Sequence, residues 1–172
     1  MNSFEYRMPQ YINEVAALLS DNANARVVSG NTDLINEIKE GIVRPTVMVS
    51  LSKISKLSDI TWSQDALVIG SMVTLKDLAS NKQIRSRCPA IAQAADSVAT
   101  PQIRNVGTLG GNLCQRPRCW YYRSSRFDCL KKGGDVCFAE DGLNKYHAIY
   151  GGMNCHIVHP SDLATALTSL KA

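Results

Sequence analysis

The chain has 172 residues, of which 45% are hydrophobic and 20% are charged, and its formal net charge is +4. These values are ordinary for a soluble globular protein of one domain or two small ones, and they permit an anionic ligand without arguing for nucleic acid. No run approaches the roughly 18 apolar residues that cross a membrane, and the N-terminus lacks a signal-peptide pattern. We therefore expect no membrane association and a cytoplasmic location.

The start of the chain alternates between strand and helix patterns. Strands are expected at 4–8, 26–29 and 46–50, and helices at 12–19 and from 34 onward. Asn31 or Thr32 is expected to cap the second helix, and Gly41 to end it. The pattern predicts a β-α-β-α-β unit, which we assign to residues 1–55 as a first subdomain.

Residues 56–172 are expected to form a second subdomain with a different order of elements. Paired strands are predicted at 59–62 and 66–70, and helices from 74, at 91–98 and at 163–170. The fold class is therefore α+β, with an α/β-like N-terminal unit.

Two glycine-containing segments are candidates for ligand binding. In Val27-Val-Ser-Gly-Asn-Thr-Asp-Leu34, a strand runs into a turn and a helix start, where unpaired N–H groups favour a phosphate. Gly30 would let anionic oxygens approach the main chain without a Cβ in the way. Such junctions are also common for purely structural reasons, which stays an alternative.

The second segment is Thr100-Pro-Gln-Ile-Arg-Asn-Val-Gly-Thr-Leu-Gly-Gly-Asn112. We expect a long polar loop, because glycines, threonines and asparagines dominate it. Interleaved apolar residues argue against disorder, and the density of donors suits an extended polar ligand such as a dinucleotide. The alternative is a compact surface loop packed by its own side chains.

These segments resemble a known family when two more are added, Ile69-Gly-Ser-Met-Val-Thr-Leu-Lys-Asp-Leu78 and His159-Pro-Ser-Asp-Leu163. In this order they resemble the FAD-binding (medium) subunit of the xanthine dehydrogenase and molybdenum hydroxylase family, over nearly the whole chain. The resemblance implies FAD as cofactor and a two-subdomain FAD-binding fold of the PCMH (vanillyl-alcohol oxidase-like) type. It also implies that the chain stops short of the family's C-terminal domain.

The resemblance assigns residues to the flavin. The first segment would hold the ADP and pyrophosphate part of FAD through Val27, Val28, Ser29, Gly30, Asn31, Thr32, Asp33 and Leu34. The second would run along the pyrophosphate and ribityl chain with Thr100, Gly107, Thr108, Gly111 and Asn112. Asp162 would bond the ribityl or ring region, although it can equally serve as a helix N-terminal acid. No catalytic residue is expected, because no nucleophile motif or histidine–carboxylate dyad is evident.

Relative to simpler family members, the chain carries an insert at about 113–158 that holds all its cysteines except Cys88. A [4Fe–4S] cluster is expected on Cys119, Cys129, Cys137 and Cys155, spaced C-x9-C-x7-C-x17-C. This spacing lacks the short knuckle of structural zinc sites, but zinc or free thiols remain alternatives. Cys114 is a reserve ligand, His156 a possible neighbour of the cluster, and the basic residues of 116–132 are expected to surround it.

This insert resembles that of the aldehyde oxidoreductase branch. The implied function is an electron-transfer subunit that passes electrons from the clusters of a molybdenum-containing hydroxylase through FAD to an acceptor. Its partners would be a large subunit that binds the molybdenum cofactor and a small [2Fe–2S] subunit, with periplasmic export of the complex as an alternative location. The rival interpretations are a metal-binding interaction module that has lost the flavin site and, less favoured, a nucleic-acid-binding module.

Overall fold

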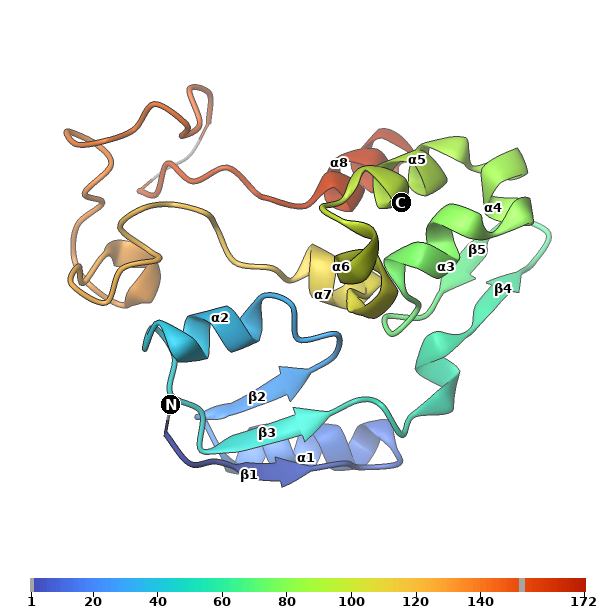
Figure 1. Ribbon diagram of the computed structural model, residues 1–172, viewed down its shortest axis with the longest axis horizontal. Helices are drawn as coiled ribbons and strands as arrows, with labels where there is room; N and C mark the ends of the chain where they lie inside the picture. The colour runs from blue at the N-terminus through green and yellow to red at the C-terminus, as the bar shows by residue number, and fades with distance from the viewer. Residues whose placement is uncertain (1, 152–153) are drawn as a thin grey trace.

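A computed structural model describes residues 2–151 and 154–172 (Figure 1). The N-terminal part is a parallel sheet of order β1-β3-β2, made of β1 (Glu5–Arg7), β2 (Ala25–Val28) and β3 (Val47–Ser50). The strands are joined by α1 (Ile12–Asp21) and α2 (Leu34–Lys39). The predicted β-α-β-α-β unit is therefore confirmed.

The two helices cover opposite faces of this sheet. Successive strand residues point to opposite sides, and in β3 the buried Met48 packs with Ile38 of α2 while the buried Val49 packs with Val15 of α1. The predicted cap of α2 was wrong by one or two residues. Asp33 occupies the N-cap position, and Asn31 instead adopts a left-handed conformation with φ 61°.

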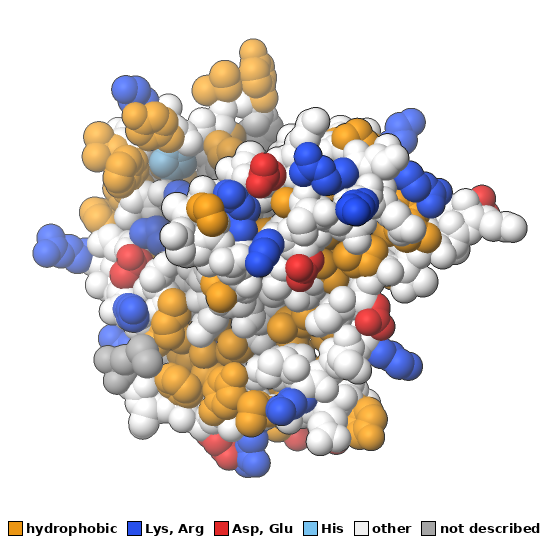
Figure 2. All heavy atoms as spheres, turned by 45° about the vertical axis from the view of Figure 1, so that its right-hand side comes forward, with side chains coloured by type: hydrophobic (Ala, Val, Ile, Leu, Met, Phe, Trp, Pro, Cys, Tyr) orange, Lys and Arg blue, Asp and Glu red, His pale blue; other side chains and the backbone are white. Residues whose placement is uncertain are grey.

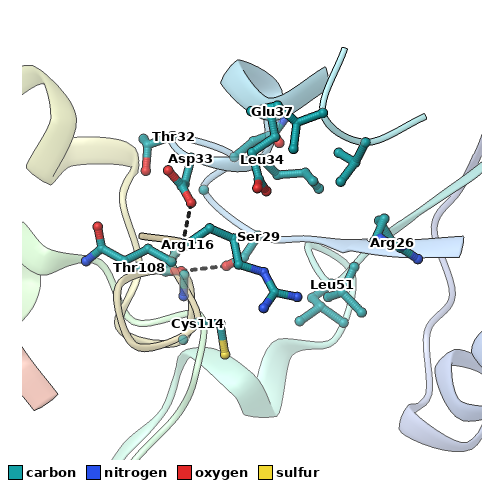
Figure 3. A pocket seen from close by; sticks show the side chains of 18 of the residues that line it. Arg26, Ser29, Thr32, Asp33, Leu34, Glu37, Leu51, Thr108, Cys114 and Arg116 are labelled. Carbon is teal, nitrogen blue, oxygen red and sulfur yellow. Dashed lines mark hydrogen bonds between the residues drawn. The ribbon is translucent and has the colours of Figure 1, made fainter. Parts of the chain in front are cut away.

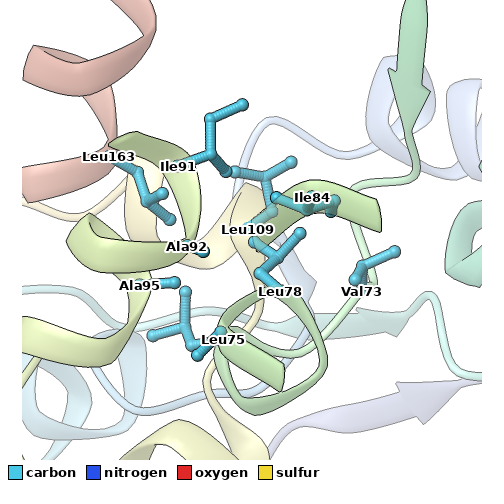
Figure 4. Close-up of a cluster of buried hydrophobic side chains, with 10 residues drawn as sticks. Val73, Leu75, Leu78, Ile84, Ile91, Ala92, Ala95, Leu109 and Leu163 are labelled. Carbon is cyan, nitrogen blue, oxygen red and sulfur yellow. The ribbon is translucent and has the colours of Figure 1, made fainter. Parts of the chain in front are cut away.

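After η1 (Ser55–Ser58), the antiparallel strands β4 (Ile60–Trp62) and β5 (Leu67–Ile69) lead into a helical layer. This layer consists of α3 (Leu75–Ser80), α4 (Lys82–Arg87), α5 (Pro89–Ser97) and α8 (Asp162–Ser169). Its core contains the fully buried Leu78, Ile84 and Leu163 (Figure 4). Helix α4 was not predicted, since Ile84 is its one buried residue and the helix carries no periodic apolar pattern.

The second glycine segment forms two short helices rather than the predicted long loop, α6 (Pro101–Val106) and α7 (Leu109–Leu113). Each begins with a threonine cap: Thr100 Oγ1 accepts from Ile103 N, and Thr108 Oγ1 accepts from Gly111 N. Threonine followed by proline is a helix-start signal. The glycines that follow in this segment favoured a loop instead, so the helix start at Thr100 was not predicted.

The cysteine-rich segment between α7 and α8 has η2 (Leu130–Lys132) as its one regular element in the described part of the chain. In Figure 1 it runs from yellow to orange and passes over α2 before it returns to α8. Tyr121, Phe127 and Phe138 pack together within it, with ring centroids 5.0–5.8 Å apart.

Apolar side chains are exposed in several parts of the surface. Figure 2 shows apolar side chains over the lower, N-terminal unit and on the loops that project at the top. The most exposed large ones lie in the cysteine-rich segment, where Ile149 and Tyr150 are 87% and 88% exposed. None of the helices in the described part of the chain has the length and apolar character that a bilayer crossing demands.

Candidate functional site

The two glycine segments both contribute residues to the wall of a cavity of about 940 Å³ (Figure 3). Its lining comes from the β2–α2 turn, the connection from α2 to β3, the start of α7 and part of the cysteine-rich segment. A second cavity of about 320 Å³ adjoins it and shares Thr32, Asp33, Thr108 and Gly111 as walls. Cofactor sites commonly have volumes of roughly 300–1,000 Å³, so the larger cavity alone is of suitable size.

The residues that we predicted to contact FAD gather here, with two exceptions. The larger cavity is lined by Val27, Ser29, Gly30, Asn31, Thr32, Asp33, Leu34, Thr108 and Gly111. The smaller one adds Gly107, Asn112 and Asp162. Val28 is instead buried against α2, and Thr100 caps α6.

Gly30 is required for a steric reason that the sequence did not indicate. A Cβ at this position would lie 2.0 Å from the carbonyl oxygen of Val106 and 3.0 Å from the Cα of Gly107. The missing side chain therefore lets the two glycine segments touch. Gly110 is in a similarly close contact, because a Cβ added at this position would lie 2.9 Å from Cβ of Ser71.

A hydroxyl pair joins the two segments at the same point. Ser29 Oγ and Thr108 Oγ1 are 2.6 Å apart, and Figure 3 draws this bond as a dashed line. Thr108 is 3% exposed, and its hydroxyl also accepts the hydrogen bond that caps α7. One side chain thus holds both the helix start and the contact between segments.

Thr108→Val should destabilise the protein by about 1–2 kcal/mol, because it removes a helix cap and a partly buried hydrogen bond at nearly constant volume. Urea unfolding measures this loss. Thr100→Val is the matched control, since Thr100 caps α6 and its hydroxyl has no bond across segments in the described structure. Equal losses for the two variants would contradict the bridging role of Thr108.

Asn31 supplies a polar atom suited to a ligand. Its side chain lines the larger cavity, and Oδ1 is buried without a hydrogen-bond partner among the described residues. Buried acceptors are normally paired. If the side chain turned toward the cavity, a ligand with hydroxyl or amino donors, such as the ribose or adenine of FAD, would satisfy it, so the residue type fits this cofactor.

Charges in the larger cavity favour an anion. Five cationic residues line it, namely Arg26, Arg44, Arg116, Lys131 and Lys132. Its two carboxylates are engaged by protein groups: Tyr122 donates to Glu37 Oε1 at 2.5 Å, and Arg118 and Arg123 pair with Asp33. The surplus positive charge suits a pyrophosphate.

Asp33 fastens the cysteine-rich segment to the N-terminus of α2. Its carboxylate accepts from Arg116 N at 2.7 Å, Arg118 Nη1 at 2.6 Å and Arg123 Nη2 at 2.8 Å. Burial alone would raise the pKa of Asp33, but these hydrogen bonds and the two guanidinium charges outweigh it and hold the pKa below its ordinary value. The predicted FAD ligand Asp33 is therefore already paired with basic groups of the chain.

Glu37 and Tyr122 form a second such link that sequence analysis missed. Both are buried, at 3% and 5% exposed. Burial, followed by the bond to Glu37, raises the pKa of the Tyr122 phenol, which stays protonated and donates. Their separation of 85 positions left no signal in the sequence.

The four predicted cluster ligands line one cavity. Cys119, Cys129, Cys137 and Cys155 all border it as free thiols, together with His147. The cavity measures only about 10 Å³, so a cluster would have to spread the surrounding loops. Within residues 2–151 and 154–172, no three His, Cys, Asp or Glu side chains come close enough to hold one metal ion.

Other expectations about the cysteine-rich segment need correction. Cys114 lines the larger cavity, apart from the other four, while Cys88 packs against the helical core as predicted. Of the basic residues expected around the cysteines, Lys131 is the one that borders their cavity in the described structure. The histidine in contact with a cysteine is His147, which sequence analysis did not single out, since 28 positions separate it from Cys119.

Residues 2–172 match the family model described as the FAD binding domain in molybdopterin dehydrogenase, and the chain belongs to this family. It is 30% identical over 174 residues to the aldehyde oxidoreductase FAD-binding subunit PaoB of Escherichia coli K12. The aligned region covers 100% of this chain and 55% of PaoB. It is 38% identical over 98 residues to the xanthine dehydrogenase FAD-binding subunit of Escherichia coli O157:H7. This aligned region covers 56% of this chain and 34% of that protein. The chain thus spans about half of PaoB and about a third of the latter.

Solved structures agree with this assignment. Quinoline 2-oxidoreductase from Pseudomonas putida 86 superposes with a TM-score of 0.63 at 32% identity, covering 65% of this chain and 39% of the matched one. Carbon monoxide dehydrogenase from Hydrogenophaga pseudoflava gives a TM-score of 0.63 at 33% identity, covering 64% and 39%. The predicted PCMH-type FAD-binding fold is confirmed.

Proposed function

We propose that the chain is the FAD- and [4Fe–4S]-binding electron-transfer subunit of a molybdenum-containing hydroxylase of the aldehyde or xanthine dehydrogenase type. The observation that carries the proposal is the convergence of Cys119, Cys129, Cys137 and Cys155 on one cavity. Tyr122 and Lys131 line both that cavity and the larger of the two cavities bordered by the glycine segments. We assign residues 1–55 and 56–172 as the two subdomains that enclose FAD.

The larger cavity would hold the ADP and pyrophosphate part of FAD, and the smaller one the ribityl chain and ring. Arg26, Arg44 and Arg116 would face the pyrophosphate, and Asn31 would accept a hydrogen bond from the ribose or adenine. Asp162 borders the smaller cavity. FAD, when bound, supplies the one- and two-electron chemistry of the subunit. The protein's part is to bind and orient the cofactor, through the Ser29–Thr108 pair and the close glycine contacts.

The chemistry of the cysteine donors suits an iron–sulfur cluster. Four thiols from separate loop positions converge with no disulfide among them. A cubane spreads its four thiolates around a core larger than one ion, so the lack of a single-ion site in the described residues is compatible with it. The match to PaoB over 100% of this chain, against 56–66% for the xanthine, nicotinate and carbon monoxide dehydrogenase relatives, favours the aldehyde oxidoreductase type.

Exposed apolar side chains support a role within a complex. Leu143, Tyr146, Ile149 and Tyr150 are all at least 70% exposed and lie in one segment. We take this concentration of exposed apolar side chains in one segment as support for a protein interface. We assign a molybdenum-cofactor-binding large subunit and a [2Fe–2S] small subunit as the partners.

The proposal is tested by iron and flavin analysis of the complex after anaerobic purification. Wild type should carry about four iron atoms at this site and one flavin. Cys129→Ser and Cys137→Ala should each lose the iron of this site and keep the flavin. Cys88→Ser is the matched control, because Cys88 packs in the helical core away from the other cysteines.

Two results would contradict the proposal. Iron content equal to wild type in both cysteine variants would exclude the cluster at this cavity. A wild-type complex with iron at the cysteines and no flavin would favour the rival interpretation, a metal-binding module without a flavin site.

A further inference from the structure

His147 lies directly against one of the proposed cluster ligands. Its Nε2 is 3.2 Å from Sγ of Cys119, within hydrogen-bond distance for sulfur. The other ring nitrogen, Nδ1, is buried without a partner among the described residues. The contact with Cys119 is therefore the one polar contact of this ring within residues 2–151 and 154–172.

The position of the ring separates two spaces. His147 and Cys119 both border the small cysteine cavity, and both also border a groove of about 400 Å³ lined by Trp120, Tyr146 and Ile157. The imidazole thus stands at the boundary between the groove and the cysteine cavity. From this position the imidazole can form a hydrogen bond to the Cys119 sulfur from outside the group of four cysteines.

The chemistry of the sulfur decides which nitrogen carries the proton. A cysteine that ligates iron is a thiolate, which can accept a hydrogen bond but cannot donate one. The contact is then a hydrogen bond only if Nε2 of His147 bears a hydrogen and donates it.

We propose that His147 is a positioning residue that donates a hydrogen bond from Nε2 to Sγ of Cys119 and thereby raises the reduction potential of the cluster. The inference rests on the proposed function. Hydrogen bonds to the sulfurs are among the factors that set iron–sulfur potentials. A donor at the thiolate stabilises the more negative, reduced state more than the oxidised one.

An EPR-monitored redox titration of the cluster in the intact complex tests the inference. His147→Leu removes the donor and should shift the midpoint potential to more negative values. The equilibrium constant for reduction should fall by a factor of about ten, which corresponds to about 59 mV for one electron. His147→Gln keeps an N–H donor on a chain of similar reach and should recover most of the shift. Asn144→Ala is the matched control, because Asn144 is an exposed neighbour whose side chain bonds Glu140 O and no cysteine, and it is expected to leave the potential unchanged.

Three outcomes would count against the inference. Potentials equal to wild type in both His147 variants would exclude a tuning role. Loss of the cluster in both variants would make His147 a ligand or a structural residue instead. A wild-type complex without iron at this site would overturn the proposed function itself, and this inference with it, and iron analysis distinguishes that case from the first two.

Discussion

Gly30→Ala is expected to destabilise the protein by about 3 kcal/mol and to abolish flavin binding. The new Cβ would lie 2.0 Å from the carbonyl oxygen of Val106 and 2.8 Å from its carbon. Both are backbone atoms, so no side-chain rotation relieves the overlap and the two glycine segments must separate. Urea unfolding and the flavin content of the purified protein measure the two effects.

Gly111→Ala provides the control within the same cavity. Its Cβ would meet only the Thr108 hydroxyl, at 3.1 Å, and the residue lies in α7, where alanine is the better helix former. We expect a loss of stability much smaller than that of Gly30→Ala, because the Thr108 hydroxyl has to shift by only a few tenths of an ångström. Flavin content should fall, because the methyl group enters the lining of both cavities. Wild-type unfolding for Gly30→Ala would show that the close contact of the two segments does not support the fold.

Asp33→Ala is expected to cost about 2–3 kcal/mol and to loosen the cysteine-rich segment from α2. The substitution removes the acceptor of three hydrogen bonds and leaves Arg123, whose side chain is 16% exposed, without its carboxylate partner. Urea unfolding measures the loss of stability. Hydrogen exchange of residues 116–123 should increase, which reports the loosening.

Asp96→Ala is the control for Asp33→Ala. Asp96 also pairs with an arginine, but it is 65% exposed and its nearest oxygen is 3.6 Å from Arg104. Exposed ion pairs contribute about 0–1 kcal/mol, so little change is expected. Equal destabilisation by the two substitutions would contradict the anchoring role of Asp33.

The pH dependence of Asp33→Ala follows from the lowered pKa of Asp33. When the folded-state pKa lies below the unfolded one, the unfolded chain binds more protons, so the stabilisation is present above the unfolded pKa and is lost as the pH falls through the folded one. The gap in stability between wild type and Asp33→Ala should therefore be full at neutral pH and shrink in acid. A gap that stays constant across this range would show that the charge on Asp33 does not contribute.

Local patterns in the sequence determined the N-terminal unit and the outline of the site. The strand and helix periods of residues 4–50 were sufficient for the β-α-β-α-β order, because each element is defined by spacings of a few residues. Motif order indicated the family and the two segments that line the cavities. The same approach failed for α6 and α7, because the glycines between these helices and within α7 favour a loop in a sequence pattern.

Tertiary structure alone decided which groups meet. Asp33 pairs with Arg123 across 90 positions, Glu37 with Tyr122 across 85, and His147 with Cys119 across 28. Gly30 is needed because Val106 passes beside it, and no feature near Gly30 in the sequence predicts this. Hydrogen-bond partners and steric contacts depend on how the segments are brought together in space, whereas helix and strand patterns depend on near neighbours along the chain.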